Sequence, residues 1–590
     1  MYLRFKTQNP KLKILPLLLV WLVIGFGLRL MNLTAKPPWT DEFSTLVFSL
    51  GNSFLPVPLD KPIPIDILLR PLQPQIGVGV KDVLTHLLRE SNHPPLYFIL
   101  THYWTKLFPT QDGLVSLWGA RSLAAFLGAL SVPAIYALSR LTFRSRLVSH
   151  IAAAIMATSP YAIFLAQEAR HYTLAILWVI ASLACLVIAT RHIKERTQLP
   201  LWIVFCWTGI NALGIASHYF FTLTLCAEAC VLLFLAWLQW EHRDNRGGEN
   251  KEDDSTLSTP SSVSPLSTPS PHPLNTWFRI GAVAAGTLIS GLVWVPVFLQ
   301  NSYGNKLTEW IQSPQHGMAW INPIFQSLAA WITMICLLPV EAANLVVIII
   351  SGLIMLIFFV WVVPILLDGV KVQLKQPKTR VMAQVFAVFT VSAIALFFTI
   401  TYFFGIDLTR GARYNFVYFP AVIILLGASL AVCWSNKEKV RWGVSGKQAV
   451  AIVVVMGMVS AITVTCNLGY QKYYRPDLFV QIIQQTSRVP ILIATTQKTH
   501  VHIGEMMGVA REFKIQSLKF ITPQFLLAHQ NEDANTSTNA LQNTLKVLSR
   551  PLDLWVVNFY APLPEEVTNC TIDSRSLPAV NGYEYKLYHC

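Results

Sequence analysis

Two adjacent carboxylates, Asp41 and Glu42, directly follow the first long apolar stretch of the chain. Charged side chains beside hydrocarbon are costly unless they are solvated, paired or in use. Other polar side chains near the ends of later apolar stretches are His93, Glu168, Arg170, Arg410, Arg413 and Tyr414. Carboxylates can take up a proton or hold a divalent cation, and cationic groups can neutralise a phosphate. The set predicts chemistry on a phosphate-bearing substrate at a membrane surface.

The composition places the chain among membrane proteins. Of its 590 residues, 53% are hydrophobic and only 13% are charged, whereas soluble domains carry about 25% charged residues. Many apolar runs reach the roughly 20 residues that a helix needs to cross the hydrocarbon core. The formal net charge of +14 would suggest nucleic acid in a soluble chain. Membrane topology accounts for it here, so no nucleic-acid partner is expected.

Lysine and arginine are unevenly shared among the loops between the apolar stretches. Six loops carry three or four each, 22 in all: residues 1–13, 140–146, 191–196, 241–279, 371–380 and 435–447. The long segment 34–118 has only six in 85 residues. Because basic loops stay in the cytoplasm, we expect an integral, multi-pass protein of the cell (inner or plasma) membrane with a cytoplasmic N-terminus and an extracytoplasmic C-terminal domain.

The expected fold is an α-helical polytopic membrane protein with about 11 transmembrane helices. The predicted spans are 13–33, 119–141, 147–166, 172–190, 200–217, 219–240, 277–299, 343–367, 381–404, 415–434 and 448–467. Two shorter apolar segments, 93–108 and 323–340, are interpreted as helices along the interface, because counting either as a span would export a basic loop. Residues 244–275 are rich in Ser, Thr and Pro and are predicted to form a disordered cytoplasmic linker.

After the last span, the long apolar runs give way to short ones in a more polar sequence. This change predicts a membrane domain over 1–470, with a first external loop at 34–118. It also predicts a small α/β extracytoplasmic domain over 471–590. Strands are expected at 489–494, 552–558 and 583–588, helices at 500–514 and 523–530, and a polar loop at 530–541. Cys570 and Cys590 lie in this polar region, either as a disulfide or as two free thiols.

Each candidate also has a purely structural interpretation. Asp41 and Glu42 suit the first turn of an interfacial helix that has Thr40 as its N-cap. His93, which precedes two prolines, suits a turn.

The later charged residues have similar alternatives. Glu168 and Arg170 could pair with each other or with lipid headgroups. Arg410 and Arg413 depart from the positive-inside trend, and binding to the phosphate of membrane lipids is the alternative to a role in catalysis.

The order of these motifs resembles glycosyltransferase family 39 of the GT-C superfamily, which includes protein O-mannosyltransferases and the aminoarabinose transferases that act on lipid A. The motifs are Trp39-x-Asp41-Glu42, His93-Pro94-Pro95-Leu96-Tyr97, Ser159-Pro160, Gln167-Glu168-Ala169-Arg170, and Arg413-Tyr414 before an apolar span with Pro420. The resemblance covers roughly residues 10–470. It implies a GT-C-like fold with interfacial helices in a long first external loop.

The resemblance also implies an inverting glycosyltransferase that takes a sugar from a polyprenyl-phosphate donor and passes it to a lipid, glycan or protein acceptor. The expected catalytic residues are Asp41, Glu42 and Glu168, and the expected substrate-binding residues are His93, Arg170, Arg410, Arg413 and Tyr414. Some relatives use a divalent cation such as Mg²⁺ or Mn²⁺ and others do not; Asp41 and Glu168 would be its ligands here. At the position of His93, the aminoarabinose transferases have a lysine that contacts the donor phosphate. This sequence departs from that pattern, so the phosphate role could belong to Arg410 or Arg413 instead of His93.

A polytopic transporter or lipid flippase is the alternative function, and a non-catalytic envelope scaffold is a third. Transporters tend to show internal repeats and ionisable groups near the midplane. This sequence has no convincing repeat, and its polar candidates gather at one predicted surface.

Overall fold

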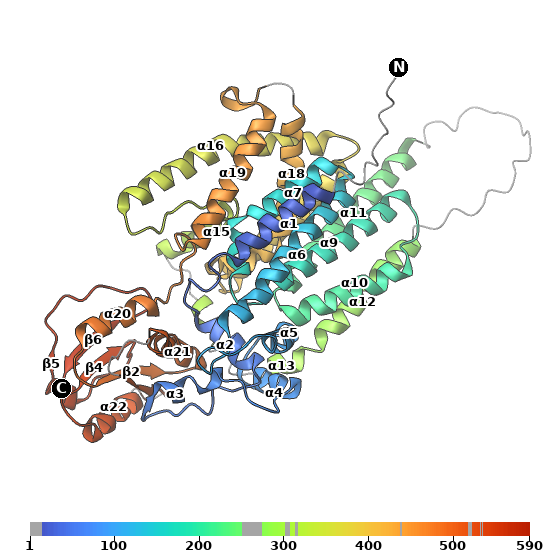
Figure 1. The fold of residues 1–590 in the computed structure, drawn as a ribbon. Helices are drawn as coiled ribbons and strands as arrows, with labels where there is room; N and C mark the ends of the chain where they lie inside the picture. Colours follow the sequence, from blue (N-terminus) through green and yellow to red (C-terminus); the bar gives the residue numbers. More distant parts are fainter. Residues whose placement is uncertain are drawn as a thin grey trace, which may run out of the picture.

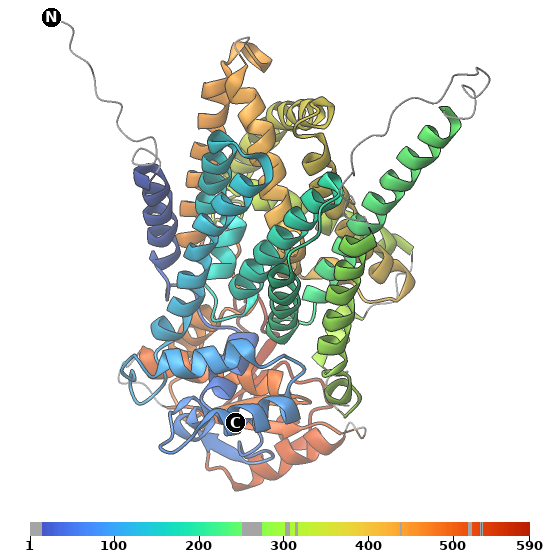
Figure 2. The same cartoon turned by 90° about the vertical axis from the view of Figure 1, so that its right-hand side faces the viewer.

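The structure is a computed structural model that describes residues 15–249, 274–300, 307–312, 317–436, 439–516, 522–531, 533 and 535–590. Long helices form a bundle, and the C-terminal sheet domain lies at one end of it together with the short helices of the first external loop (Figures 1 and 2). Helix α1 (Leu15–Leu30) begins at the opposite end of the bundle. The candidate site lies between the bundle and the sheet domain.

The predicted polytopic helical fold is confirmed. Among the described residues, seven helices are long and apolar enough to cross a membrane, namely α6 (Leu117–Phe143), α9 (Tyr172–Glu195), α11 (Phe221–Glu249), α12 (Leu274–Leu292), α16 (Leu345–Lys375), α17 (Arg380–Phe403) and α19 (Gly446–Thr465). A bent pair, α7 (Arg146–Thr158) and α8 (Pro160–Ala166), adds an eighth. Three shorter apolar helices are α1, α10 (Leu201–Ser217) and α18 (Phe419–Ser435). These elements coincide with the eleven predicted spans.

The Ser159-Pro160 motif is the point where the third span bends by 54°. Pro160 has no backbone N–H and therefore cannot continue the hydrogen bonding of α7. The Ser159 hydroxyl accepts a hydrogen bond from the amide of Ala162 and donates one to the carbonyl of Met334 at 2.9 Å. The bend directs the segment after α8, residues 167–171, toward the first external loop, where the Ala169 amide bonds to Glu42.

Short helices occupy the end of the bundle that faces the sheet. The first external loop contains α2 (Thr40–Ser49), α3 (Ile65–Leu68), α4 (Val80–Glu90) and α5 (Leu96–Thr105). Helix α5 falls in the segment predicted as an interfacial helix, and α15 (Asn322–Ile335) falls in the other. With 10 and 14 residues, both are too short to span the hydrocarbon core. The predicted N-cap is off by one residue, since Trp39 is the N-cap of α2 and Thr40 its first residue.

The C-terminal domain contains a six-stranded mixed sheet with the order β1-β3-β2-β4-β6-β5. Its strands are β1 (Pro62–Pro64), β2 (Ile491–Gln497), β3 (Gln524–His529), β4 (Asp553–Val557), β5 (Thr571–Ile572) and β6 (Tyr585–His589). The central strand β2 pairs in parallel with β3 on one side and with β4 on the other. The chain passes from β2 through α21 (His500–Ile515) to β3, then through α22 (Asn535–Val547) to β4. This reversal of direction beside β2 makes a topological switch point.

Several sequence predictions for this region need correction. The segment 523–530, predicted as helical, is strand β3, and most of the predicted loop 530–541 belongs to the start of α22. The edge strand β1 comes from the first external loop and pairs antiparallel with β3. Cys570 and Cys590 form a disulfide bond. In the predicted linker, helix α11 extends to Glu249, and residues 250–273 lie outside the described residues.

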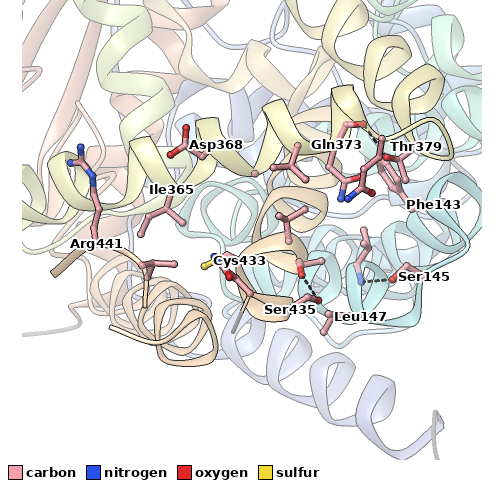
Figure 3. A pocket seen from close by; sticks show the side chains of 18 residues that line it. Phe143, Ser145, Leu147, Ile365, Asp368, Gln373, Thr379, Cys433, Ser435 and Arg441 are labelled. Carbon is pink, nitrogen blue, oxygen red and sulfur yellow. Dashed lines mark hydrogen bonds between the residues drawn. The ribbon is translucent and has the colours of Figure 1, made fainter. Parts of the chain in front are cut away.

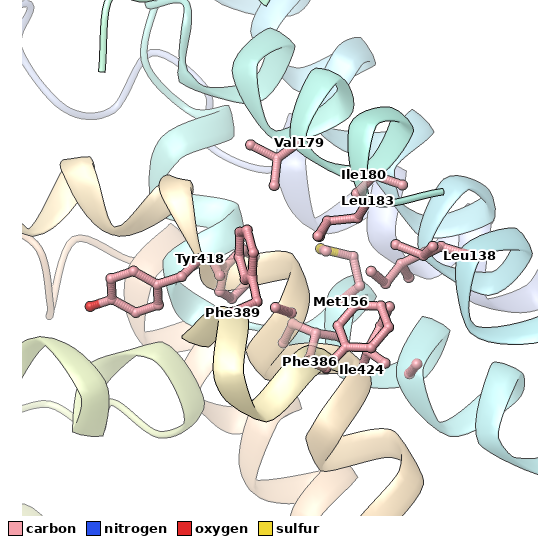
Figure 4. Close-up of a cluster of buried hydrophobic side chains, with 14 of the residues drawn as sticks. Leu138, Met156, Val179, Ile180, Leu183, Phe386, Phe389, Tyr418 and Ile424 are labelled. Carbon is pink, nitrogen blue, oxygen red and sulfur yellow. The ribbon is translucent and has the colours of Figure 1, made fainter. Parts of the chain in front are cut away.

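The two largest hydrophobic cores among the described residues lie in different parts of the molecule. The first lies inside the helical bundle, where Met156 of α7, Leu183 of α9, Phe386 of α17 and Ile424 of α18 gather side by side (Figure 4). The second joins the first external loop to the C-terminal domain, because residues of α2 such as Phe43 share it with residues of α21 and of the sheet. The first external loop is thus held between the bundle and the sheet domain.

Candidate active site

Asp41 lies in the first turn of α2 and is the partly exposed carboxylate of the candidate site. Its side chain is 28% exposed, and its Oδ2 lies 3.5 Å from Nη2 of Arg170 and 3.8 Å from Nη2 of Arg413. The two arginines come from the connections after α8 and before α18, far apart in the sequence. Two guanidinium groups thus face one carboxylate that a ligand can still reach.

Glu42, the neighbour of Asp41, is fully buried and bound on both oxygens. Arg121 of α6 donates from Nε to Oε1 and from Nη2 to Oε2, each at 2.8 Å, and the Ala169 amide also donates to Oε1. Burial opposes ionisation, but Arg121 and the Ala169 amide hold the pKa of Glu42 below its usual value. This geometry does not fit the catalytic role predicted for Glu42. It fits a residue that fixes α2 against the bundle.

Arg170 connects the acidic motif to the His-Pro-Pro motif. It is 1% exposed and donates from Nη1 to the Asp41 carbonyl at 3.0 Å and to the Thr45 hydroxyl at 3.1 Å. Its Nη2 lies 2.8 Å from Nε2 of His93, whose Nδ1 is 2.9 Å from the Ser91 hydroxyl.

His93 does not fit the predicted role of a cation that neutralises phosphate. Burial, followed by the charge of Arg170, keeps the pKa of His93 well below its usual value, so the ring is neutral near pH 7. A neutral Nε2 accepts the hydrogen bond from Arg170. His93 therefore orients Arg170, which carries the charge.

Arg413 is surrounded by aromatic rings. Its guanidinium lies 4.4 Å from the ring centre of Trp39, 5.2 Å from that of Trp310 and 5.6 Å from that of Tyr414. Arginine stacks well on aromatic faces and is weakly hydrated. The side chain is 17% exposed. Tyr414, predicted to bind substrate, thus contributes one wall around the Arg413 charge.

Arg410 is not brought to the Asp41 carboxylate. Its Nε pairs with Oδ2 of Asp407 at 3.3 Å, and its Nη1 donates to the carbonyl of Trp310 at 2.6 Å. Because Trp310 stacks on Arg413, Arg410 supports the site from outside. The substrate contact predicted for Arg410 does not fit this position.

Glu168 lies close to the same cluster but is closed off. It is 2% exposed, and its Oε1 is paired with the ammonium group of Lys472, which follows the last span. The second oxygen, Oε2, is buried and has no hydrogen-bond partner. Lys472 also lies 5.2 Å from the ring centre of Trp39, so the Trp39 ring contacts both Lys472 and Arg413. Glu168 sets the position of a further cation, Lys472, beside the site.

Sequence reasoning missed three residues of this region. Arg121 lies just inside a predicted apolar span, and a charged residue there is itself a signal of pairing or function. Lys472 follows directly on the last span, among aromatic residues. His171 packs 5.4 Å from the His93 ring, is 1% exposed, and has no hydrogen-bond partner on either nitrogen. No local pattern would have connected the last two to Asp41.

The cluster does not fit a divalent cation as it stands. Such an ion needs several oxygen ligands that converge without competing positive charge. Asp41 instead faces Arg170 and Arg413, and Glu168 is paired with Lys472. Among the described residues, no group of three His, Cys, Asp or Glu side chains could hold a metal ion. We therefore derive no step through a metal.

A separate cavity of about 700 Å³ lies at the other end of the bundle (Figure 3). The turn between α6 and α7, the end of α16 and the end of α18 line it with residues such as Ser145, Gln373 and Cys433. None of the residues of the Asp41 cluster lines this cavity.

The geometry defines a helical membrane protein with an accessible carboxylate between two arginines. The family model described as dolichyl-phosphate-mannose-protein mannosyltransferase matches residues 98–266, which is less than a third of the chain. This match confirms the resemblance to glycosyltransferase family 39 and the predicted enzyme class, a glycosyltransferase. No curated protein sequence matches the chain.

Solved structures with a similar arrangement include ArnT from Cupriavidus metallidurans bound to undecaprenyl phosphate, which is 12% identical, covers 98% of both chains and has a TM-score of 0.47. The Pmt1-Pmt2 complex of S. cerevisiae bound to the sugar donor is 14% identical over 51% of this chain and 35% of that chain, with a TM-score of 0.31. The oligosaccharyltransferase AglB from Archaeoglobus fulgidus, in complex with an inhibitory peptide and a dolichol-phosphate, is 12% identical over 85% and 64%, with a TM-score of 0.40. With TM-scores below 0.5, these likenesses assign no role to any residue of this chain.

Proposed function

We propose that the protein is an inverting glycosyltransferase that transfers a sugar from a polyprenyl-phosphate donor to a lipid, glycan or protein acceptor. The observation that carries the proposal is the position of Asp41. It is a partly exposed carboxylate with guanidinium groups at 3.5 and 3.8 Å, at the end of the bundle beside the sheet domain. This set provides one base and two cations, as transfer from a phosphate requires.

In the proposed step, Asp41 accepts the proton of an acceptor hydroxyl as its oxygen attacks the anomeric carbon of the donor sugar. A bond forms between this oxygen and the carbon, and the bond from the same carbon to the phosphate oxygen breaks. The electron pair leaves with the polyprenyl phosphate. Arg413 stabilises the growing negative charge, because it is held in place before the reaction begins, and Arg170 keeps Asp41 in position.

The arrangement of the two arginines supports different tasks for each. Arg170 is buried and spends its hydrogen bonds on Asp41, Thr45 and His93, so it fixes the position of the base. Arg413 keeps 17% of its side chain exposed and Arg170 only 1%, whereas the buried Nε of each arginine has no hydrogen-bond partner. Arg413 is therefore the better placed to meet the donor phosphate.

The proposed orientation puts this end of the bundle on the outer face of the cell membrane. It depends on the Lys/Arg bias of the loops. The basic connections α6–α7 and α18–α19 lie at the end of the bundle away from the sheet domain (Figures 1 and 2).

The test is transfer of label from radioactive polyprenyl-phosphate sugars by the purified full-length protein. Asp41→Asn should lower the rate by at least about 100-fold, since it removes the base and keeps the size of the side chain. Asp66→Asn is the matched control, because Asp66 is an exposed carboxylate of the same loop, paired with Lys514. Wild-type transfer by Asp41→Asn would refute the assignment, and no label transfer by the wild type from any donor would refute the function.

A further inference from the structure

A second cavity, of about 400 Å³, lies in the C-terminal domain. It is lined from α21 by Glu505, from the end of β4 by Asn558 and Tyr560, and from the loop before β6 by Tyr583. Glu505 lies in the helix that follows β2, and Asn558 and Tyr560 follow β4, so these three residues come after the carboxyl ends of the parallel strands at the switch point of the sheet. Open α/β sheets bind ligands at such a place, and the volume lies within the range of small-molecule sites.

The lining combines aromatic rings with neutral or acidic polar groups and one histidine, His502, whose pKa is lowered by burial. Tyr473 and Tyr560 are 71% and 57% exposed, although large aromatic rings are usually covered. Among the described residues that line the cavity, none is Lys or Arg, whereas Glu505 and Glu584 are both present. An anionic ligand would therefore be repelled. The donor phosphate and the headgroups of anionic lipids do not suit this cavity.

Two polar groups in the cavity are arranged as a built site would be. The hydroxyl of Tyr583 is buried and has no hydrogen-bond partner, and the residue is only 5% exposed. A buried polar group without a partner is costly unless a ligand completes it. Glu505 accepts a hydrogen bond from the Tyr474 hydroxyl at 2.5 Å. Asn558 adopts a left-handed backbone with φ 45°, which is uncommon outside glycine and occurs at functional sites.

The cavity is joined to the Asp41 cluster by the chain itself. Lys472, which pairs with Glu168, is followed directly by Tyr473 and Tyr474 of the cavity. On the other side, Gly504 of α21 packs against α2, where an added Cβ would make an ordinary van der Waals contact of 3.6 Å with Cα of Thr40. The next residue, Glu505, faces the cavity. The two sites are therefore neighbours on one face of the protein.

We propose that this cavity binds a neutral sugar ring of the acceptor. This proposal rests on the proposed glycosyl transfer. Sugar rings present C–H faces that pack on aromatic rings and hydroxyl groups that need hydrogen-bond partners. Tyr473 and Tyr560 offer the flat faces. Glu505 and the free hydroxyl of Tyr583 offer the partners.

The test is binding of neutral sugars to the full-length protein in a detergent without a sugar headgroup, measured by saturation-transfer NMR. The panel contains glucose, galactose, mannose, N-acetylglucosamine and their disaccharides, with inorganic phosphate as the anionic comparison. We expect at least one neutral sugar to bind and phosphate not to compete with it. A further measurement compares the bound sugar with its alkyl glycoside. Tighter binding of the alkyl glycoside would indicate a lipid-linked acceptor, and equal binding would indicate a glycan without lipid.

Two variants make the test specific. Tyr560→Ala and Tyr473→Ala should each weaken sugar binding by at least about fivefold, since each removes an aromatic face. Tyr103→Ala is the matched control, because Tyr103 is a 58% exposed ring on α5, outside the cavity. Failure of every sugar to bind, or wild-type binding by both variants, would overturn the proposal. Asp41→Asn should bind sugar like the wild type, so loss of the transfer function and loss of this subsite are distinguishable.

Discussion

The cluster around α2 and the cavity of the C-terminal domain are adjacent, yet they shift the pKa values of buried carboxyl groups in opposite directions. In the cluster, Glu42 is bound by Arg121, which holds the pKa of the carboxyl below its usual value. In the cavity, burial raises the pKa of Glu505 to about 7, and hydrogen bonds with Tyr474 and Asn558 offset the effect of burial only in part. Both carboxyl groups are buried, so the neighbouring charge decides between them.

This contrast in charge indicates which kind of ligand each region suits. In the cluster, Arg170 and Arg413 lie beside the partly exposed Asp41, and Arg121 and Lys472 pair with Glu42 and Glu168. The two arginines beside Asp41 suit a phosphate that develops charge. The cavity has no cation among its described lining residues and suits a neutral, hydroxyl-rich ligand. Four changes test this contrast.

The largest expected effect is on folding, at Glu42. Glu42→Gln should destabilise the protein by about 3–5 kcal/mol, because it leaves the Arg121 charge buried without its partner. The measurement is the apparent unfolding temperature of the purified protein, followed by intrinsic fluorescence. The double variant with Arg121→Met should recover part of the loss, since no unpaired charge remains. An unfolding temperature equal to that of the wild type would show that the pair does not hold α2.

The next effect is a pH dependence at Glu505. Its pKa is raised from 4.5 to about 7 in the folded protein, so the folded state holds the proton more tightly than the unfolded state. The resulting stability is fully present below about pH 4.5 and is lost as the pH rises through 7, by up to about 3 kcal/mol.

Glu505→Gln should therefore flatten the decline in unfolding temperature between pH 5 and pH 8. The other titrating groups are the same in both proteins, so the difference between the two curves isolates Glu505. Parallel curves for the wild type and the variant would contradict the raised pKa.

A third effect concerns catalysis at Arg413. Arg413→Ala should lower label transfer by about 100-fold with little change in unfolding temperature, because a preorganised positive charge on the leaving phosphate is lost. Arg413→Lys should recover only part of the rate, since an ammonium group lacks the planar stack on Trp39. Full activity of the alanine variant would move the phosphate role to another cation of the cluster.

The smallest effect is expected at Arg410. This residue is 36% exposed and pairs with Asp407 outside the cluster. Arg410→Ala should cost less than about 1 kcal/mol in stability, and transfer should fall far less than in Arg413→Ala. A loss as large as that of Arg413→Ala would place Arg410 on the substrate after all.

The sequence predicted the bundle well and the sheet domain less well, for a physical reason. A long apolar run in a membrane must be helical, since every backbone group has to be bonded within the segment. No such rule applies to a run of about six apolar residues in a soluble domain, where length and periodicity do not separate strand from helix. The segment of β3 was misread for this reason. The pairing of β1 with β3 joins residues more than 450 positions apart, which no local pattern reveals.

For the candidate site, the sequence alone predicts which charged residues take part and that they lie at the same membrane surface. Charged groups beside apolar spans must gather where water reaches them. Which carboxylate is open and which is closed was decided only by packing. Asp41 and Glu42 are neighbours in the sequence, but successive residues of a helix point in directions about 100° apart. One side chain therefore meets Arg121 inside the protein, and the other meets Arg170 and Arg413 and stays 28% exposed.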